Sequence, residues 1–458
     1  MKDYPGEITD QNIRSIFDNA ADFNARALSC GGKTLTAYAI DGLTSGGDIS
    51  HYIVKPIQEL LQGDTMEEMY DNALRGAVVN SVAKPCKTLD DIALFLVNGF
   101  CVVLFPSVGA IAFETKTSVS RLPNIPQVEN TVKCPKDSFV ETIRTNTSLV
   151  RRHLRSPNLR IFETRVGRHS LTNVSLIWLD GVTDPSLPER MRKRLESMDI
   201  DAMLTPSSVE EYLTGSRKTA FPMLQYTERT DRFCQGLVQG RVGVFVDGLP
   251  LGYLAPVDLG YLMNSPEDLG RDYISASCVR VLRYGALLLD LLLPALYVAM
   301  MMFHKMLLPG WLQDNTVQLP YSPAWEILGL LIAFELLQES GIHLPQSIGQ
   351  SVSILGGIVI GSAAVEAGII SPLALIAVSI TGICGFVLPN RDLATAIRVW
   401  RFALAALAAI AGLWTVALGL LCLLLHLARL KSLGVPYLIP FESTLMRHRL
   451  MRKNNAKK

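Results

Sequence analysis

The sequence predicts two α/β subdomains in tandem, followed by an all-α domain of several membrane-crossing helices. The chain has 458 residues, of which 49% are hydrophobic and 19% charged, and its mean hydropathy is +0.27. The charged fraction lies below the roughly 25% of ordinary soluble domains. The apolar residues are unevenly distributed, because long runs with few charges begin near residue 284. Before that point charged residues occur throughout, and the first 260 residues contain an internal repeat.

The repeat predicts the architecture of the first half. Residues 35–49 and 175–188 each show a strand pattern, an Asp-Gly turn and the start of a helix. Residues 88–113 match 229–254, and in both a helix pattern ends at glycine and a hairpin pattern follows. We therefore expect two α/β subdomains of related design.

The composition along the chain gives the expected domain boundaries. The polar start, MKDYPGEITDQNIRS, lacks the apolar core of a secretory signal, so the N-terminal part is expected to stay on the cytoplasmic side. The expected parts are a first cytosolic subdomain (1–115), a connecting helical segment (116–172), a second cytosolic subdomain (173–278), a transmembrane helical domain (279–428) and a basic cytoplasmic tail (429–458).

An arginine-rich run lies in and near the connecting segment, where residues 138–154 have a helical pattern. Two interpretations are open. The run forms a surface that binds nucleic acid or anionic lipid, or it forms a solvated helix face or a subunit interface. The second interpretation is preferred, and no nucleic-acid partner is expected, because no known nucleic-acid-binding motif accompanies the run. Its members are Arg144, Arg151, Arg152, Arg155, Arg160, Arg165 and Arg168.

The apolar second half predicts four to six membrane segments, since about 20 apolar residues cross a bilayer. By the positive-inside rule the basic tail lies in the cytoplasm. The loop with Arg391, Arg398 and Arg401 is also expected inside, which conflicts with a single span over 402–428. The apolar runs are 284–303, 325–337, 348–370, 373–388 and 402–428.

No enzyme signature is present. The sequence lacks a P-loop, a G-x-S-x-G motif, an H-E-x-x-H motif and the kinase motifs. Its eight cysteines form no C-x-x-C pair, which argues against a metal site. We therefore expect no catalytic residues, no metal and no cofactor.

Three carboxylates lie within apolar runs, namely Asp290, Glu335 and Glu366. Ionisable groups at membrane depth are costly and usually face a helix interior or water. They are candidates for lining a cation path. The alternative is that Glu326, Glu339 and Glu366 are interfacial and that Asp290 pairs with a neighbouring side chain.

A small-residue pattern favours close helix packing. Gly357 and Gly361 have G-x-x-x-G spacing, and Ser353 lies one turn earlier. Small side chains at this spacing allow helices to approach within a subunit or between subunits.

The chain resembles the A subunits of GerA-type spore germinant receptors and their paralogue, stage V sporulation protein AF. The similarity extends from about residue 35 to 440. It is carried by KDSFVETIRTNTSLVRRHL (136–154), LIWLDGVTDPSLPERMRKRLESMDID (176–201), FPMLQYTERTDR (221–232), AFELLQESGIHLPQSIGQSVSILGGIVIGSAAVEAGIISP (333–372) and LGVPYLIP (433–440).

The resemblance implies a multi-pass protein of the spore inner membrane with a cytoplasmic N-terminal domain. It implies two partners, a transporter-like B subunit and a lipoprotein C subunit, and self-association into a nutrient-gated channel for monovalent cations. Two other functions stay open: a non-conducting scaffold of germination complexes, and a secondary transporter with a cytosolic regulatory domain. A transporter is expected to have two related membrane halves, whereas the repeat here lies in the soluble part.

Overall fold

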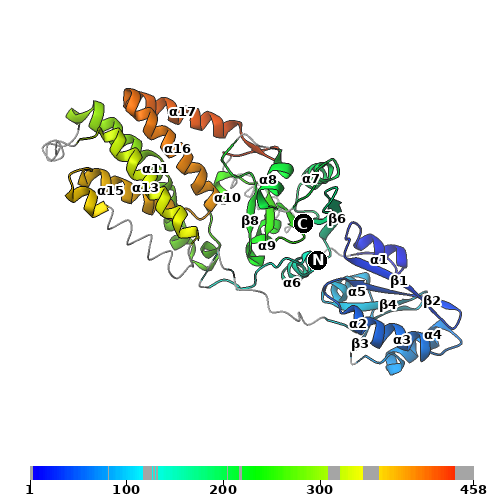
Figure 1. Ribbon diagram of the computed structural model, residues 1–458. Coiled ribbons are helices and arrows are strands. Elements are labelled where there is room, and N and C mark those ends of the chain that lie inside the picture. Colours follow the sequence, from blue (N-terminus) through cyan, green and yellow to red (C-terminus); the bar gives the residue numbers. More distant parts are fainter. Residues whose placement is uncertain are drawn as a thin grey trace. The chain divides into compact units, whose positions relative to one another are not determined.

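The computed structural model describes residues 4–80, 82–116, 126, 129, 131, 133–203, 205–215, 219–307, 320–343 and 361–438. The chain forms two compact units (Figure 1). The α/β unit comprises Met1–Ser216 and Leu224–Pro256, and the helical unit comprises Arg217–Met223 and Val257–Lys458. The chain therefore passes between the two units three times.

The first subdomain of the α/β unit is a three-layer structure around an antiparallel sheet. Because side chains alternate along a strand, β4 sends Val102 and Leu104 to one face, and Val103 and Phe105 to the other. Helices α1 (Asp10–Ile16) and α5 (Leu89–Val97) cover the first face. The second face is covered by α2 (Gly46–Ile49), η1 (Ser50–Val54), α3 (Lys55–Glu59), α4 (Met66–Asn72) and η2 (Ala73–Ala77). The strand order is β1 (Phe23–Cys30), β2 (Lys33–Ile40), β4 (Phe100–Phe105), β5 (Gly109–Glu114) and β3 (Ala83–Cys86).

The second subdomain repeats this topology. Its strands lie in the order β6-β7-β9-β10-β8, which corresponds to β1-β2-β4-β5-β3 of the first. The turns after β2 and β7 match as well, since Gly42 and Gly181 adopt φ of 83° and 75°, values that glycine reaches without strain. The predicted repeat is thereby confirmed. Its elements are α6 (Ile143–His153), β6 (Leu159–Val166), β7 (Thr172–Leu179), α7 (Ser186–Glu196), α8 (Pro206–Thr214), β8 (Gln225–Thr227), α9 (Thr230–Val238), β9 (Val242–Val246) and β10 (Gly252–Ala255).

The boundaries of these parts differ from those expected. The segment 116–172 is not only a connector, because β6 lies within it and pairs along its whole length with β7. The repeated motifs begin only at the second strand of each sheet, so they left the first strand out. The helical unit begins at Val257 rather than near 279. Its first residues belong there because α10 (Leu259–Leu262) and η3 (Pro266–Gly270) contact other parts of that unit.

The arginines of helix α6 join the two subdomains within the α/β unit. Both guanidinium and carboxylate of the Arg151–Asp22 pair are 1% exposed, and two hydrogen bonds of 2.7 Å connect them. Arg144 lies 3.2 Å from Asp41 and 3.1 Å from Glu163. Arg144 and Arg151 thus bind carboxylates of their own chain and join its two subdomains.

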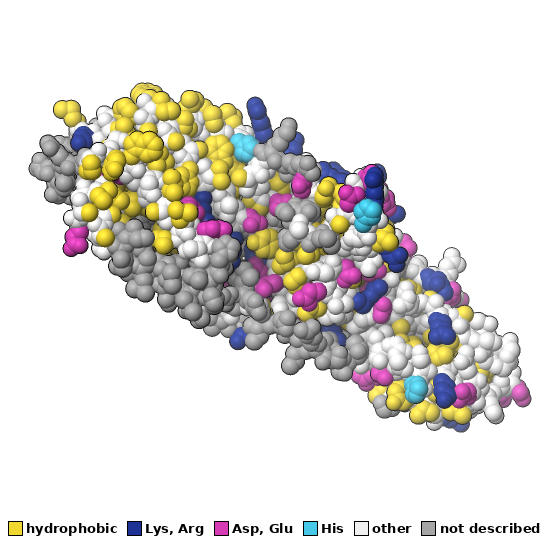
Figure 2. All heavy atoms as spheres, in the orientation of Figure 1, with side chains coloured by type: hydrophobic (Ala, Val, Ile, Leu, Met, Phe, Trp, Pro, Cys, Tyr) yellow, Lys and Arg dark blue, Asp and Glu magenta, His cyan; other side chains and the backbone are white. Residues whose placement is uncertain are grey.

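Five long helices form most of the helical unit. Helix α11 (Tyr273–Phe303) contacts the other four, α13 (Pro323–His343), α15 (Pro372–Val387), α16 (Arg391–Ala411) and α17 (Leu413–Arg429). Within the described ranges α11 and α16 are long and apolar enough to cross a membrane, and α15 and α17 are shorter apolar helices. Apolar side chains cover much of the visible surface of these helices (Figure 2). The smaller elements are η4 (Lys305–Leu307), a helical stretch at 361–366, β11 (Lys431–Ser432) and β12 (Val435–Pro436).

Helices α16 and α17 form an antiparallel hairpin. Gly412, with φ 64° and ψ −135°, separates them, so the apolar run 402–428 is not one helix. The Thr415 hydroxyl donates to the Leu407 carbonyl, and farther from the turn the rings of Trp400 and His426 lie 6.0 Å apart. The start of α16 and the end of α17 therefore lie at the same end of the hairpin.

Candidate functional site

A network of four charged side chains joins three helices of the helical unit. Asp290 lies on α11, Glu335 on α13, and Arg398 and Arg401 on α16. Arg401 donates to Asp290 at 2.5 Å and to Glu335 at 2.7 Å. Arg398 donates to the other oxygen of Glu335 at 3.1 Å. Two carboxylates and two guanidinium groups balance each other in this charged network.

The centre of the charged network is almost completely buried. The side chains of Asp290 and Arg401 are 1% and 2% exposed, whereas those of Glu335 and Arg398 are 26% and 32% exposed. Asp290 Oδ2 and Arg401 Nε are buried and have no hydrogen-bond partner among the residues that the structure describes. Gly385 of α15 lies beside this oxygen, since a Cβ at that position would be 3.5 Å from it. A buried charge is tolerated only when it is paired, so Asp290 depends on Arg401.

The structure brings together two of the three predicted carboxylates. Asp290 and Glu335 share Arg401, as the pairing alternative for Asp290 expects. Glu366 is exposed in the helical stretch 361–366 and takes no part in the charged network. In the sequence, Arg398 and Arg401 indicate only the orientation of the chain across the membrane. Their i, i+3 spacing places both on one helix face, which is the signal that could have identified them as partners.

The predicted packing residues are only partly described. Gly361 is buried, and a Cβ at this position would lie 3.0 Å from Leu375 of α15. Gly357 and Ser353 lie outside the described residues. A packing role for the group stays a prediction.

A second buried carboxylate, Glu326, lies in the first turn of α13. Its Oε1 accepts the backbone N–H of Ser371 at 2.9 Å, and its Oε2 lies 3.4 Å from the Ser371 hydroxyl. Ser371 is the N-cap of α15 and accepts the N–H of Ala374 at 3.1 Å. Tyr297 of α11 shares a 2.9 Å hydrogen bond with the same hydroxyl. This polar group connects the starts of α13 and α15 to α11.

The points where the chain enters the helical unit are held by its C-terminal hairpin. The buried Ser432 hydroxyl donates to the Met223 carbonyl at 2.7 Å and accepts the Val257 N–H at 3.1 Å. The Ser432 side chain therefore binds the backbone at two of the three positions where the chain enters or leaves the helical unit. Nearby, Thr219 and His426 of α17 share a hydrogen bond of 3.0 Å. Residues 430–437 are thus part of the folded unit rather than a free tail.

A further ion pair fixes the start of α11. Asp268, in η3, accepts hydrogen bonds of 2.5 and 2.8 Å from Arg283. Burial raises the pKa of Asp268, but the hydrogen bonds from Arg283 and from the Ser265 N–H outweigh it, so the net pKa lies below its usual value. The carboxylate therefore stays ionised and paired at neutral pH.

Comparisons with known proteins identify the family. The family model described as Bacillus/Clostridium GerA spore germination protein matches residues 11–457. The chain belongs to the GerA family of spore germination proteins. Spore germination protein B1 of Bacillus subtilis is 31% identical, over 94% of this chain and 88% of the relative. Spore germination protein A1 of the same organism is 34% identical, over 78% and 75%.

Two further matches of this GerA-family protein are a membrane protein and a domain of known structure. A Bacillus subtilis protein named uncharacterized membrane protein YfkQ is 36% identical, over 93% of this chain and 84% of the relative. A solved crystal structure, that of the N-terminal domain of the A subunit of the Bacillus megaterium spore germinant receptor GerK3, has 24% sequence identity to this chain. It covers 54% of this chain and 92% of that domain, with a TM-score of 0.43.

The site chemistry of this GerA-family protein consists of ion pairs and hydrogen bonds. Within the described ranges no group of three or more His, Cys, Asp or Glu side chains could hold a metal ion. The charged side chains that converge in the helical unit connect α11, α13 and α16.

Proposed function

We propose that this chain is the membrane subunit of a spore germinant receptor and oligomerises into a nutrient-gated cation channel. Membership of the GerA family, with relatives named spore germination proteins, supports a role in germination. The proposed partners are a transporter-like B subunit and a lipoprotein C subunit. The proposed location is the spore inner membrane, with the N-terminal unit in the cytoplasm.

The helix hairpin supports the proposed orientation. Arg391 begins α16, and Arg429 ends α17. Because the hairpin is antiparallel, both basic ends lie on one side, and the positive-inside rule assigns that side to the cytoplasm. The conflict in the charge pattern disappears when 391–429 crosses the membrane as two helices. With α11 and α15 also crossing, the helical unit is multi-pass.

The observation that carries the channel proposal is the buried charged network. Arg401 lies near the middle of a helix long enough to cross a membrane, and it neutralises Asp290 and Glu335. A cation path lined by these carboxylates is closed to cations while the guanidinium groups occupy it, because like charges repel. We propose that the described arrangement is the resting one and that conduction requires α16 to move away from α11 and α13.

Ion flux tests this function. The purified full chain is reconstituted into liposomes with its B and C partners, and potassium release on nutrient addition is recorded for wild type, Asp290→Asn, Glu335→Gln and Glu366→Gln. The proposal expects Asp290→Asn or Glu335→Gln to raise the basal flux, since each weakens the charged network. A ring-shaped assembly without flux would show a scaffold, and flux unchanged in all three variants would remove these carboxylates from gating and from the ion path.

A further inference from the structure

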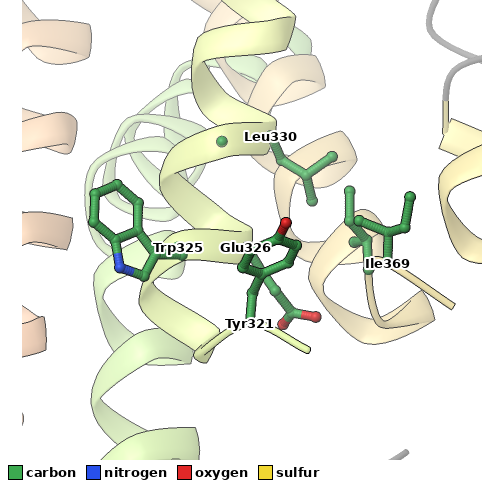
Figure 3. A pocket seen from close by; sticks show the side chains of 7 residues that line it. Tyr321, Trp325, Glu326, Leu330 and Ile369 are labelled. Atoms are coloured by element: carbon green, nitrogen blue, oxygen red, sulfur yellow. The ribbon is translucent and has the colours of Figure 1, made fainter. Parts of the chain in front are cut away.

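An apolar pocket opens beside Glu326 on the surface of the helical unit. Its volume is about 440 Å³, within the range of roughly 300–1,000 Å³ found for small-molecule sites. It lies between the first two turns of α13 and the residues that lead into α15. Figure 3 shows Tyr321, Glu326, Leu330 and Ile369 gathered around it. The lining residues are Tyr321, Trp325, Glu326, Gly329, Leu330, Ile369 and Ile370.

Glu326 places a carboxyl group in this apolar pocket, and among the described residues it has no cationic partner, so its negative charge is costly until a cation binds. Glu326 is 5% exposed, and its partners are the N–H and hydroxyl of Ser371, which are both neutral. Asp290 and Asp268 of the same unit differ in this respect, since each pairs with an arginine. No ion pair joins Glu326 to any described residue. A carboxylate can accept about four hydrogen bonds, so one or more acceptor sites are open to a ligand.

The remaining walls of the pocket suit an aliphatic body. Leu330, Ile369 and Ile370 supply branched apolar surface. Gly329 leaves the space beside α13 open, because a Cβ there would meet nothing within 4 Å. Tyr321 and Trp325 also line the pocket and are 58% and 71% exposed, and aromatic faces attract cations. In Figure 3 Trp325 points away from the other labelled side chains, so Tyr321 is the aromatic residue on the side of Glu326. The pocket thus combines apolar walls, a carboxylate with no cationic partner among the described residues, and an aromatic ring.

We propose that this pocket binds an aliphatic primary ammonium group, with the N–H donors on Glu326 and the hydrocarbon chain along Leu330, Ile369 and Ile370. Charge complementarity selects an ammonium over a neutral or anionic amphiphile of the same length. The ammonium comes from a free alkylamine or from the headgroup of an aminophospholipid. The site is distinct from the charged network, and its test requires neither germination nor ion flux.

The binding experiment uses the full chain in phosphatidylcholine nanodiscs at pH 7.5, titrated in a calorimeter with n-hexylamine, n-hexanol or hexanoate. An alkylamine is charged at this pH, as lysine is. Wild type is expected to bind the amine at least tenfold more tightly than the alcohol and not to bind hexanoate detectably. Equal affinity for amine and alcohol in the wild type would overturn the proposal.

Variants identify the residues. Glu326→Gln keeps an oxygen for the Ser371 N–H and removes the charge, so it should reduce the amine preference to less than about twofold. Gly329→Leu fills the pocket and should weaken amine and alcohol at least tenfold. Gly285→Leu of α11 is the matched control, because a Cβ at Gly285 also meets nothing within 4 Å, and it should leave both affinities unchanged. An unchanged amine preference in Glu326→Gln would contradict the proposal, as would equal losses in the two leucine variants.

Two further measurements complete the test. Circular dichroism and gel filtration establish whether each variant is folded. The comparison of amine, alcohol and carboxylate in the wild type remains valid even if a variant does not fold. Nanodiscs containing phosphatidylethanolamine separate the two sources. Weakened hexylamine binding in these discs identifies the lipid headgroup as the occupant, and unchanged binding identifies a free amine; either result supports the site.

Discussion

Arg401→Met is the most informative perturbation of the charged network. It leaves Asp290 fully buried and without its cation, whereas Glu335 keeps Arg398. Removing one partner of a buried ion pair costs about 3–5 kcal/mol. We therefore expect the free energy of unfolding of the helical unit to fall by about 3–5 kcal/mol. The second variant, Arg401→Met with Asp290→Asn, should recover about 1–3 kcal/mol of this loss, since it removes the unpaired charge.

Chemical denaturation of the full chain in dodecyl maltoside measures these differences. Four of the five tryptophans lie beyond residue 257, so intrinsic fluorescence reports mainly the helical unit. Arg398→Met is the matched control, because Arg398 is 32% exposed. Ion pairs that reach the solvent contribute less than about 1 kcal/mol to the free energy of unfolding. If Arg401→Met costs no more than Arg398→Met, or if the Asp290→Asn change adds to the loss, the inference that Asp290 depends on Arg401 is wrong.

Three other parts of the chain give further predictions. Asp22→Asn leaves Arg151 buried without a carboxylate, so the α/β unit should lose about 3–5 kcal/mol, measured as faster amide hydrogen exchange in α6; unchanged exchange would contradict this. Ser432→Ala leaves two buried backbone groups unsatisfied and should cost about 1–3 kcal/mol; unchanged proteolysis at 219–223 would speak against it. The hydrogen bond between His153 and Asp137 raises the pKa of His153. Burial raises the pKa of Asp137, but the hydrogen bond outweighs burial, so the net pKa of Asp137 lies below its usual value. The ion pair therefore stabilises the folded protein at pH values between the pKa of Asp137 and the raised pKa of His153. The free energy of unfolding should fall as the pH rises from 6 to 8. A His153→Gln variant whose stability depends on pH in the same way as that of the wild type would refute this.

The sequence predicted the α/β unit well because its determinants are local. Alternating apolar residues, Asp-Gly turns and helix ends at glycine recur in both halves, and the same strand order follows. The first strand of each sheet was missed. β1 is an edge strand with many exposed side chains, so its hydrophobic pattern is weak, and β6 is likewise an edge strand.

The apolar runs predicted helices, but not where they break or what they face. Gly412 looks like any small residue in an apolar run, and only its backbone conformation shows that it ends α16. The arginines of α16 looked like a cytoplasmic loop. Arg401 lies inside because Asp290, 111 positions earlier in the chain, offers it a buried partner, and no local pattern carries that information.

The sequence by itself determined that this chain joins a repeated α/β unit to an apolar helical part, and that it belongs with the GerA-type proteins. Hydrophobic periodicity and motif order are written in neighbouring residues, so they can be recognised without coordinates. The tertiary structure alone decided which embedded carboxylates are neutralised. Asp290 and Glu335 lie within apolar runs and Glu326 lies at the start of one, yet the first two share Arg401, whereas Glu326 lines a pocket and has no cationic partner among the described residues. The free energy of a buried charge depends on its nearest neighbours in space, and these come from distant parts of the chain.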